Sequence, residues 1–155
     1  MKKIIMLLMF CCSFAVQASA QEIMEEVRNI MDGYEKVKND TNKDLEIRKV
    51  ATFKWDAIYY MILQASDKGN MSEAELGIQV NSMIDFVNQF LADMKDNRKK
   101  NQKEVTLAKY RAASLKNPLY GDTDKEMVNA YVDHPNFLTQ FSLDTDWVKA
   151  LKAVK

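Results

Sequence analysis

Apolar residues recur in this chain at intervals of four and three, which is the spacing of one face of an α-helix. The clearest stripe consists of Leu76, Val80, Met83, Val87, Phe90 and Met94. Ile84 and Leu91 thicken this stripe, as expected for a helix that buries one face. The chain has only four glycines and two prolines, too few for the regular turns of a β-sandwich or barrel. The sequence therefore predicts an all-α protein.

Two long helices are predicted before this stripe. The first covers residues 23–37, with Ile23, Val27, Ile30, Tyr34 and Val37 on its apolar face. The second begins near Thr41–Asp44, where T-x-x-D resembles a capping box, and runs to about Ser66. Because residues 57–63 are apolar all round, we expect the second helix to form the centre of the fold. Met61, in that run, is predicted to lie in the core.

The third helix has a clear start and an ambiguous end. Ser72–Glu75 matches an S-x-x-E capping box, and Phe90 in the stripe is predicted to be a core residue. Asp96–Lys103 is almost wholly polar, so it is either a break or a solvated stretch of one long helix that ends near Leu115. The apolar face predicted for the stretch after the polar residues consists of Val105, Ala108, Ala112 and Leu115.

Shorter elements are expected after the turn at residues 117–122. Thr123–Val132 reads as a short helix with Met127, Val128 and Tyr131 inward, and Pro135 suits the first turn of another. The last helix should hold Trp147, Val148, Leu151 and Val154, with Asp144 or Thr145 as its cap. The overall prediction is a single-domain helical bundle over residues 21–155, with about three long antiparallel helices capped by short C-terminal helices.

The first twenty residues have the layout of a cleaved signal peptide. Lys2 and Lys3 precede an apolar run over residues 4–16, and the small-x-small sequence Ala18-Ser19-Ala20 follows. Cleavage after Ala20 predicts a periplasmic or secreted protein with no transmembrane segment in the mature chain. Lipidation at Cys11 or Cys12 is the less favoured alternative, because Phe10 stands where a lipobox has a small residue.

Cleavage would leave a mature chain without cysteine, which removes disulfides, thiol nucleophiles and cysteine-ligated metals from consideration. Loss of Lys2 and Lys3 would leave 20 basic and 22 acidic residues, so nucleic acid is not an expected partner. With His134 as the only histidine, a hydrolytic triad is not favoured either. The acidic clusters at residues 122–126 and 144–146 lack the loop glycine of an EF-hand, and we interpret them as helix caps. No catalytic, metal or cofactor-binding residue is predicted.

Two surfaces remain as candidates for binding. Between Lys95 and Arg111 the chain carries seven basic and two acidic residues, and the proposed partner surface consists of Lys95, Arg98, Lys99, Lys100 and Lys103. The second candidate is an aromatic group of Phe53, Trp55, Tyr59 and Tyr60, which is expected to be core unless part of it is exposed. Expected partners are an envelope protein, a glycan or an anionic surface, and the oligomeric state is left open.

Three segments together resemble an uncharacterised family of small secreted helical proteins of Bacteroidota. They are the signal ending at Ala20 before Gln21-Glu22, the turn Asn117-Pro118-Leu119, and the segment Thr139–Trp147. The resemblance implies export from a bacterial cell, and it implies no activity and no functional residues. The function predicted from the sequence is thus a non-catalytic binding or structural module of the cell envelope. The alternative is an envelope enzyme that depends on carboxylates or a metal and has no recognisable motif.

Overall fold

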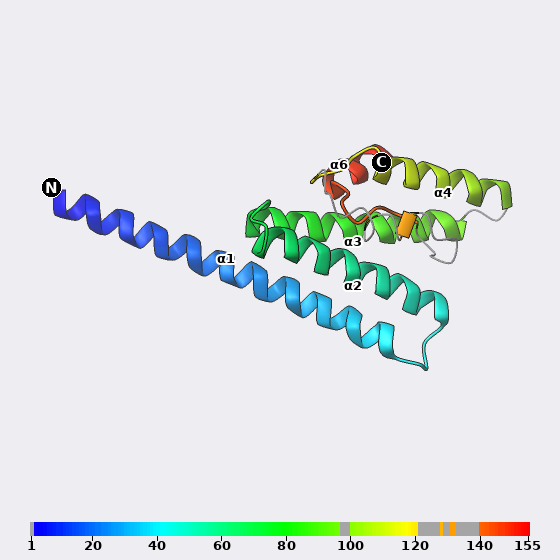
Figure 1. The fold of residues 1–155 in the computed structure, drawn as a ribbon, viewed down its shortest axis with the longest axis horizontal. Helices are drawn as coiled ribbons and strands as arrows, with labels where there is room; N and C mark the ends of the chain where they lie inside the picture. Colours follow the sequence, from blue (N-terminus) through cyan, green and yellow to red (C-terminus); the bar gives the residue numbers. More distant parts are fainter. Residues whose placement is uncertain (1, 97–99, 121–127, 129–130, 133–139) are drawn as a thin grey trace.

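The computed structural model describes residues 2–96, 100–120, 128, 131–132 and 140–155, and side chains from residue 21 onward (Figure 1). Within these residues the chain is helical and has no β-strand, which confirms the predicted all-α class. The helices are α1 (Lys2–Asn39), α2 (Leu45–Ser66), α3 (Glu73–Asp96), α4 (Lys100–Leu115) and α6 (Trp147–Val154).

Helix α3 is the centre of the fold. Its backbone lies close to all four of the other described helices, whereas the backbone of α2 lies close to α1 and α3 and reaches α6 only through the Phe53 ring. The prediction that the second helix would be central was therefore wrong. The apolar run in α2 is not buried on every face, since the side chain of Tyr59 is 40% exposed. Figure 1 shows α1 and α2 as an antiparallel pair, with α3 beside α2 and α4 running back along α3.

The polar stretch after α3 is a break rather than a solvated length of helix. Helix α3 ends at Asp96, and α4 begins at Lys100 and packs back against α3. A continuous helix from residue 73 to residue 115 could not make this contact with itself. The predicted end at Leu115 is confirmed, and the Asn117 side chain donates a 2.6 Å hydrogen bond to the carbonyl of Ala113 there.

The caps of the helices follow the sequence only in part. At α3 the capping box is confirmed, because Ser72 Oγ accepts from the Glu75 N–H and Glu75 Oε2 accepts from the Ser72 N–H. At α2 the predicted box does not form. Asp44 is the N-cap residue without a side-chain hydrogen bond, and Asp40 Oδ1 instead accepts from the Asn42 N–H in a short turn.

The cap of the last helix is Asp146, not Asp144 or Thr145. The Asp146 side chain accepts a 3.1 Å hydrogen bond from the Lys149 N–H. Both predicted caps are engaged in the turn before the helix: Asp144 Oδ1 accepts from Ser142 Oγ, and Thr145 Oγ1 donates to the Ser142 carbonyl. The same turn forms an isolated bridge between Pro118 and Thr145, which joins the end of α4 to the start of α6.

The core is a cluster of aromatic rings in edge-to-face contact. Phe86 of α3 contacts the rings of Tyr110, Phe141 and Trp147 at centroid distances of 5.1 to 5.5 Å. Phe53 of α2 reaches the same cluster. Edge-to-face pairs of this kind are favourable beyond the area they bury. The core predictions for Met61 and Phe90 are confirmed, since each side chain is 1% exposed.

The predicted inward face of α4 was wrong. Val105 and Leu115 are 70% and 45% exposed, whereas Tyr110 is fully buried. The inward positions carry polar atoms that find partners across the interface: Tyr110 donates to Asp93 at 2.6 Å, and Ser114 pairs with Thr145. Because hydroxyl groups occupy this face, an apolar stripe did not mark it.

The predicted short helices near residues 123–140 lie largely outside the described residues, including Met127, His134, Pro135 and the acidic cluster at 122–126. Val128 and Tyr131 are described and buried, as predicted. In the last helix Trp147, Leu151 and Val154 are buried, and Val148 is partly exposed.

Candidate partner-binding surface

Two of the basic residues singled out in the sequence, Lys95 and Lys103, lie at the end of the molecule where α3 ends and α4 begins. Lys95 lies in the last turn of α3 and is exposed. Lys103 lies in the first turn of α4 and is also exposed. Lys100 is the first residue of α4, but its side chain is not described, and Arg98 and Lys99 lie outside the described residues. The structure therefore brings Lys95 and Lys103 to the same end of the protein.

An apolar groove lies between the start of α2 and the C-terminal part of α3. Its volume is about 200 Å³, and it is lined by Glu46, Ile47 and Val50 of α2 and by Leu91 of α3. Leu91 precedes Lys95 by four residues, so the two side chains share one face of α3. Ile47 is 50% exposed and its neighbour Leu45 is 60% exposed. We call the groove formed by Ile47, Val50 and Leu91 the basic-end groove.

The groove is open because α1 does not cover this end of α2 and α3. At Ile23, just past the middle of α1, this helix lies close to α3: a Cβ atom built on Gly77 would be 3.1 Å from Ile23 Cγ2. Toward Asn39 the two helices splay apart (Figure 1). The Gly77 face of α3 continues through Ile84 and Asn88 to Leu91. Leu91 therefore belongs to the stripe that faces α1, at the point where α1 has moved away.

A buried lysine lies between the region where α1 packs closely on α3 and the region where the two helices splay apart. Lys54 of α2 is 6% exposed, and its Nζ donates a 2.7 Å hydrogen bond to Asn88 Oδ1 of α3. Its ammonium also lies 5.2 Å from the ring centroid of Tyr34 on α1. Burial lowers the pKa of Lys54 to about 8, opposed in part by the charge of Asp85. Lys54 thus links all three helices, and its charge is engaged inside the fold.

The aromatic group divides into an inward and an outward pair. Phe53 and Tyr60 are buried, which confirms the core prediction for those two. Trp55 and Tyr59 point away from that cluster and stack on each other, with centroids 5.3 Å apart and planes at 12°. The other contact of the Trp55 ring is Lys38 of α1, whose Nζ lies 3.4 Å from the centroid. With Tyr59 and Lys38 both stacked on it, Trp55 ties α1 to α2 and is not a free platform.

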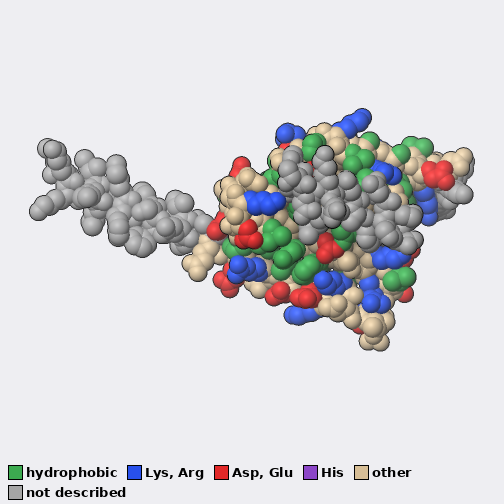
Figure 2. Space-filling model, in the orientation of Figure 1, with side chains coloured by type: hydrophobic (Ala, Val, Ile, Leu, Met, Phe, Trp, Pro, Cys, Tyr) green, Lys and Arg blue, Asp and Glu red, His purple; other side chains and the backbone are tan. Residues whose placement is uncertain are grey.

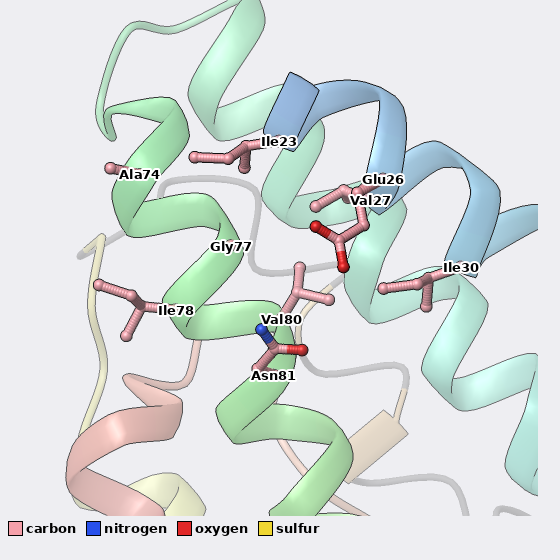
Figure 3. A pocket seen from close by; sticks show the side chains of 9 residues that line it. All are labelled: Ile23, Glu26, Val27, Ile30, Ala74, Gly77, Ile78, Val80 and Asn81. Atoms are coloured by element: carbon pink, nitrogen blue, oxygen red, sulfur yellow. The ribbon is translucent and has the colours of Figure 1, made fainter. Parts of the chain in front are cut away.

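A second groove opens at the other end of the molecule, between α1 and α3. Its volume is also about 200 Å³. Figure 3 shows Ile23, Val27 and Ile30 on the α1 side. The α3 side is formed by Ala74, Gly77, Ile78, Val80 and Asn81. The Glu26 carboxylate points into the space between the two helices (Figure 3). Ile78 stands on its rim and is 57% exposed.

The acidic side chains that line the pockets of the described part of the chain do not converge on one centre. Each of three pockets is lined by a single carboxylate, Glu26, Glu46 or Glu75, the last in a cavity of about 90 Å³ beside Tyr120. Asp93 accepts from Tyr110, and Asp146 caps α6. Within the described residues no group of three or more His, Cys, Asp or Glu side chains is placed to hold a metal ion.

Sequence reasoning located the basic residues but missed the groove beside them. Ile47 lies in the first turn of α2, and Leu91 lies at the edge of the apolar stripe of α3. In the sequence, both look like ordinary members of an apolar helix face. No local signal distinguishes an apolar residue that a neighbouring helix covers from one that it leaves open. In the part of the chain that is described, no helix is both long and apolar enough to cross a membrane.

Comparison with protein-family models, with curated proteins and with solved structures found no match to this chain.

Proposed function

We propose that this chain is an exported, non-catalytic helical module of the bacterial cell envelope that binds a partner protein at the basic-end groove. The observation that carries the proposal is an open apolar groove lined by Ile47, Val50 and Leu91, with Lys95 one helical turn beyond Leu91 on α3. An exposed apolar patch with charged residues at its edge is typical of protein-binding surfaces. The groove supplies buried area, and the lysines supply orientation and a faster association rate.

The partner segment that fits this surface has an apolar side chain flanked by acidic residues. The groove is lined by Ile47, Val50 and Leu91, so it favours an aliphatic residue over a sugar or a phosphate. Lys95 lies one helical turn beyond Leu91 on α3 and supplies a positive charge for an acidic partner residue. Glu46 is the acidic residue at its edge.

Export is supported by the N-terminal pattern and by the resemblance to secreted Bacteroidota proteins. Cleavage after Ala20 would make Gln21 the first residue of the mature protein and would leave the buried side chain of Val27 in place. Mass spectrometry of the protein from its native envelope tests this part. A mature N-terminus at Gln21 is expected, and an intact Met1 or a lipid on Cys11 or Cys12 would contradict it.

A binding module is favoured over an enzyme because three of the described carboxylates make hydrogen bonds that stabilise the fold. Asp93 anchors Tyr110, Asp146 anchors α6, and Glu75 closes the capping box. A hydrolase with two acting carboxyl groups would need them to face each other across a substrate cleft. The pockets instead present one carboxylate each among mainly apolar side chains.

The binding proposal is tested with a synthetic amphipathic helical peptide. Leucines occupy one face of this peptide, and glutamates occupy the positions that flank that face. Reversal of the basic segment by Arg98→Glu, Lys99→Glu and Lys100→Glu should slow its association several-fold at low salt. The matched control carries Lys36→Glu, Lys116→Glu and Lys152→Glu, which are exposed elsewhere and change the net charge equally. The control should bind like the wild type.

Two outcomes would overturn the proposal. Equal association of both triple variants would show that the effect is one of net charge and not of this surface. Binding to a polyglutamate peptide without leucine as tightly as to the amphipathic peptide would show that the groove takes no part. Circular dichroism of each variant establishes that the helices are intact.

A further inference from the structure

Helices α4 and α6 form a layer of their own, on the side of α3 that faces away from α1 and α2 (Figure 1). Among the described helices, α4 and α6 lie close only to each other and to α3. Two hydrogen bonds set α6 antiparallel beside α4. Ser114 pairs with Thr145, just before α6 begins, and Lys109 Nζ donates at 2.8 Å to the carbonyl of Val154, where α6 ends. The outer side of this α4–α6 layer is therefore a surface that α1 and α2 do not cover.

The α4–α6 layer carries charge of the opposite sign to the three helices before it. Residues 21–96, which hold the described side chains of α1, α2 and α3, contain fifteen acidic and nine basic residues. Residues 101–116 and 147–154 contain one acidic residue, Glu104, and six basic ones. The six are Lys103, Lys109, Arg111, Lys116, Lys149 and Lys152. Figure 2 shows basic and apolar side chains along the edge of the molecule where Figure 1 places α4 and α6.

Most of this positive charge is not neutralised within the fold. Lys149 is the exception, because its Nζ lies 3.0 Å from Oδ2 of Asp146. The hydrogen bonds of Lys109 and Arg111 go to uncharged oxygens, the carbonyl of Val154 and the side-chain amide of Gln140. The other three lysines of the layer are exposed. The α4–α6 layer therefore presents a net positive charge to a partner outside the molecule.

An exposed apolar strip runs along α4 between these basic residues. Its members follow one another at intervals of three, four and three: Val105, Ala108, Ala112 and Leu115. Val105 is 70% exposed and Leu115 is 45% exposed. Lys109 and Lys116 lie on one flank of the strip, and Arg111 lies on the other. An apolar strip between basic flanks is typical of a helix that lies in the plane of a membrane interface.

We propose that the outer side of the α4–α6 layer docks on the anionic surface of a phospholipid bilayer. The lysines contact the headgroups, and Val105 and Leu115 enter the boundary between headgroups and acyl chains. An acidic protein is a poorer match to this surface. Five of the six basic residues are lysine, which protein interfaces deplete, and the strip has alanines where such interfaces have aromatic anchors. The surface is separate from the basic-end groove on α2 and α3, so a docked molecule can still bind a partner protein there.

Charge reversal tests the electrostatic part of this proposal. Protein isolated from the native host is sedimented with vesicles of equal parts phosphatidylglycerol and phosphatidylcholine at low salt. Lys116→Glu with Lys152→Glu should weaken binding at least about tenfold. The matched control, Arg28→Glu with Lys36→Glu, makes the same change in net charge at exposed positions of α1 and should bind like the wild type. Binding of the wild type should fall as salt is added.

Substitutions in the apolar strip test whether α4 enters the interface. Val105→Ser with Leu115→Ser keeps every charge and should weaken vesicle binding several-fold. Ile78→Ser is the control, because Ile78 is also 57% exposed but lies on α3; it should leave binding unchanged. Circular dichroism and urea melts establish that the variants fold, as expected for exposed positions.

Several results would overturn the proposal. They are equal binding of the wild type to vesicles of phosphatidylcholine alone, equal weakening by the two charge-reversal pairs, and no weakening by the serine pair. A wild type that binds polyglutamate through Lys116 and Lys152, but binds no vesicle, would identify the layer as a surface for an acidic protein instead. The groove is tested separately: Leu91→Glu should abolish binding of the amphipathic peptide and leave vesicle binding intact. Failure of either proposal is thus distinguishable from failure of the other.

Discussion

The side chain of Gln79 holds the first residue of α6 in place: its Oε1 accepts a 2.7 Å hydrogen bond from the backbone N–H of Trp147. Its Nε2 donates to Asp146 Oδ1 at 3.2 Å. One amide on the central helix thus satisfies the backbone and the cap of a helix 68 residues away in sequence. The same anchor positions the Trp147 ring against Phe86 in the aromatic core.

Replacing Gln79 should therefore loosen the C-terminal segment. Gln79→Leu keeps the bulk but leaves the Trp147 N–H buried without an acceptor, which costs about 1–3 kcal/mol. Urea melts followed by tryptophan fluorescence measure the loss in the free energy of unfolding. The exposed amide of Gln102 provides the control, and Gln102→Leu should change stability by less than about 0.5 kcal/mol. Equal effects of the two substitutions would show that the Gln79 bonds contribute nothing.

The core positions predicted from the α2 and α3 patterns should be costly to truncate. Met61→Ala and Phe90→Ala each remove a side chain that is 1% exposed, and each should lower the free energy of unfolding by about 2–5 kcal/mol. Val105→Ala on the exposed face of α4 should alter it by less than about 0.5 kcal/mol. A loss below about 1 kcal/mol at either core site would mean that the helix faces are wrongly placed.

Two helical glycines should respond differently to alanine. Nothing lies within 4 Å of the position that a Cβ on Gly33 would take, so Gly33→Ala should stabilise the protein by about 0.5–1 kcal/mol. A Cβ on Gly77 would lie 3.1 Å from Ile23 Cγ2, and the displacement of α1 should cancel most of that gain. Thermal melts of the two variants give the comparison. Equal stabilisation would show that α1 does not pack closely on α3 at Gly77.

The half-buried carboxyl of Asp56 should make stability depend on pH. Burial raises its pKa to about 6 from 3.8, and the charge of Lys38 opposes the rise. The folded state therefore binds this proton more tightly than the unfolded chain does. Its contribution to stability grows as pH falls from about 6 toward 3.8 and is lost as pH rises through 6.

Asp56→Asn removes this titration, so urea melts should show higher stability than the wild type at neutral pH and a smaller difference near pH 4. The exposed Asp32 serves as the control, and Asp32→Asn should leave the pH profile unchanged. An identical pH profile for wild type and Asp56→Asn would contradict the assignment.

Local patterns were sufficient for much of the fold. The 4–3 spacing from Leu76 to Met94 predicted the buried face of α3, and the Ser72–Glu75 box predicted where that helix begins, because both depend on residues within a few turns of one another. The apolar run over residues 57–63 placed Met61 in the core. Basic residues at Lys95 and Lys103 were visible in the sequence as a run of like charge.

What decided the rest was contact between segments far apart in the chain. The hydroxyl of the inward-facing Tyr110 donates a hydrogen bond to Asp93 on α3. Asp146 caps α6, while Asp144 accepts a hydrogen bond from Ser142. The groove at Leu91 is open because α1 crosses α3 closely at Gly77 and then leaves it. Helical periodicity states which residues share a face, whereas the path of a third helix determines whether that face is covered. The apolar stripes were therefore a property of the sequence, and the binding surface is a property of the tertiary structure.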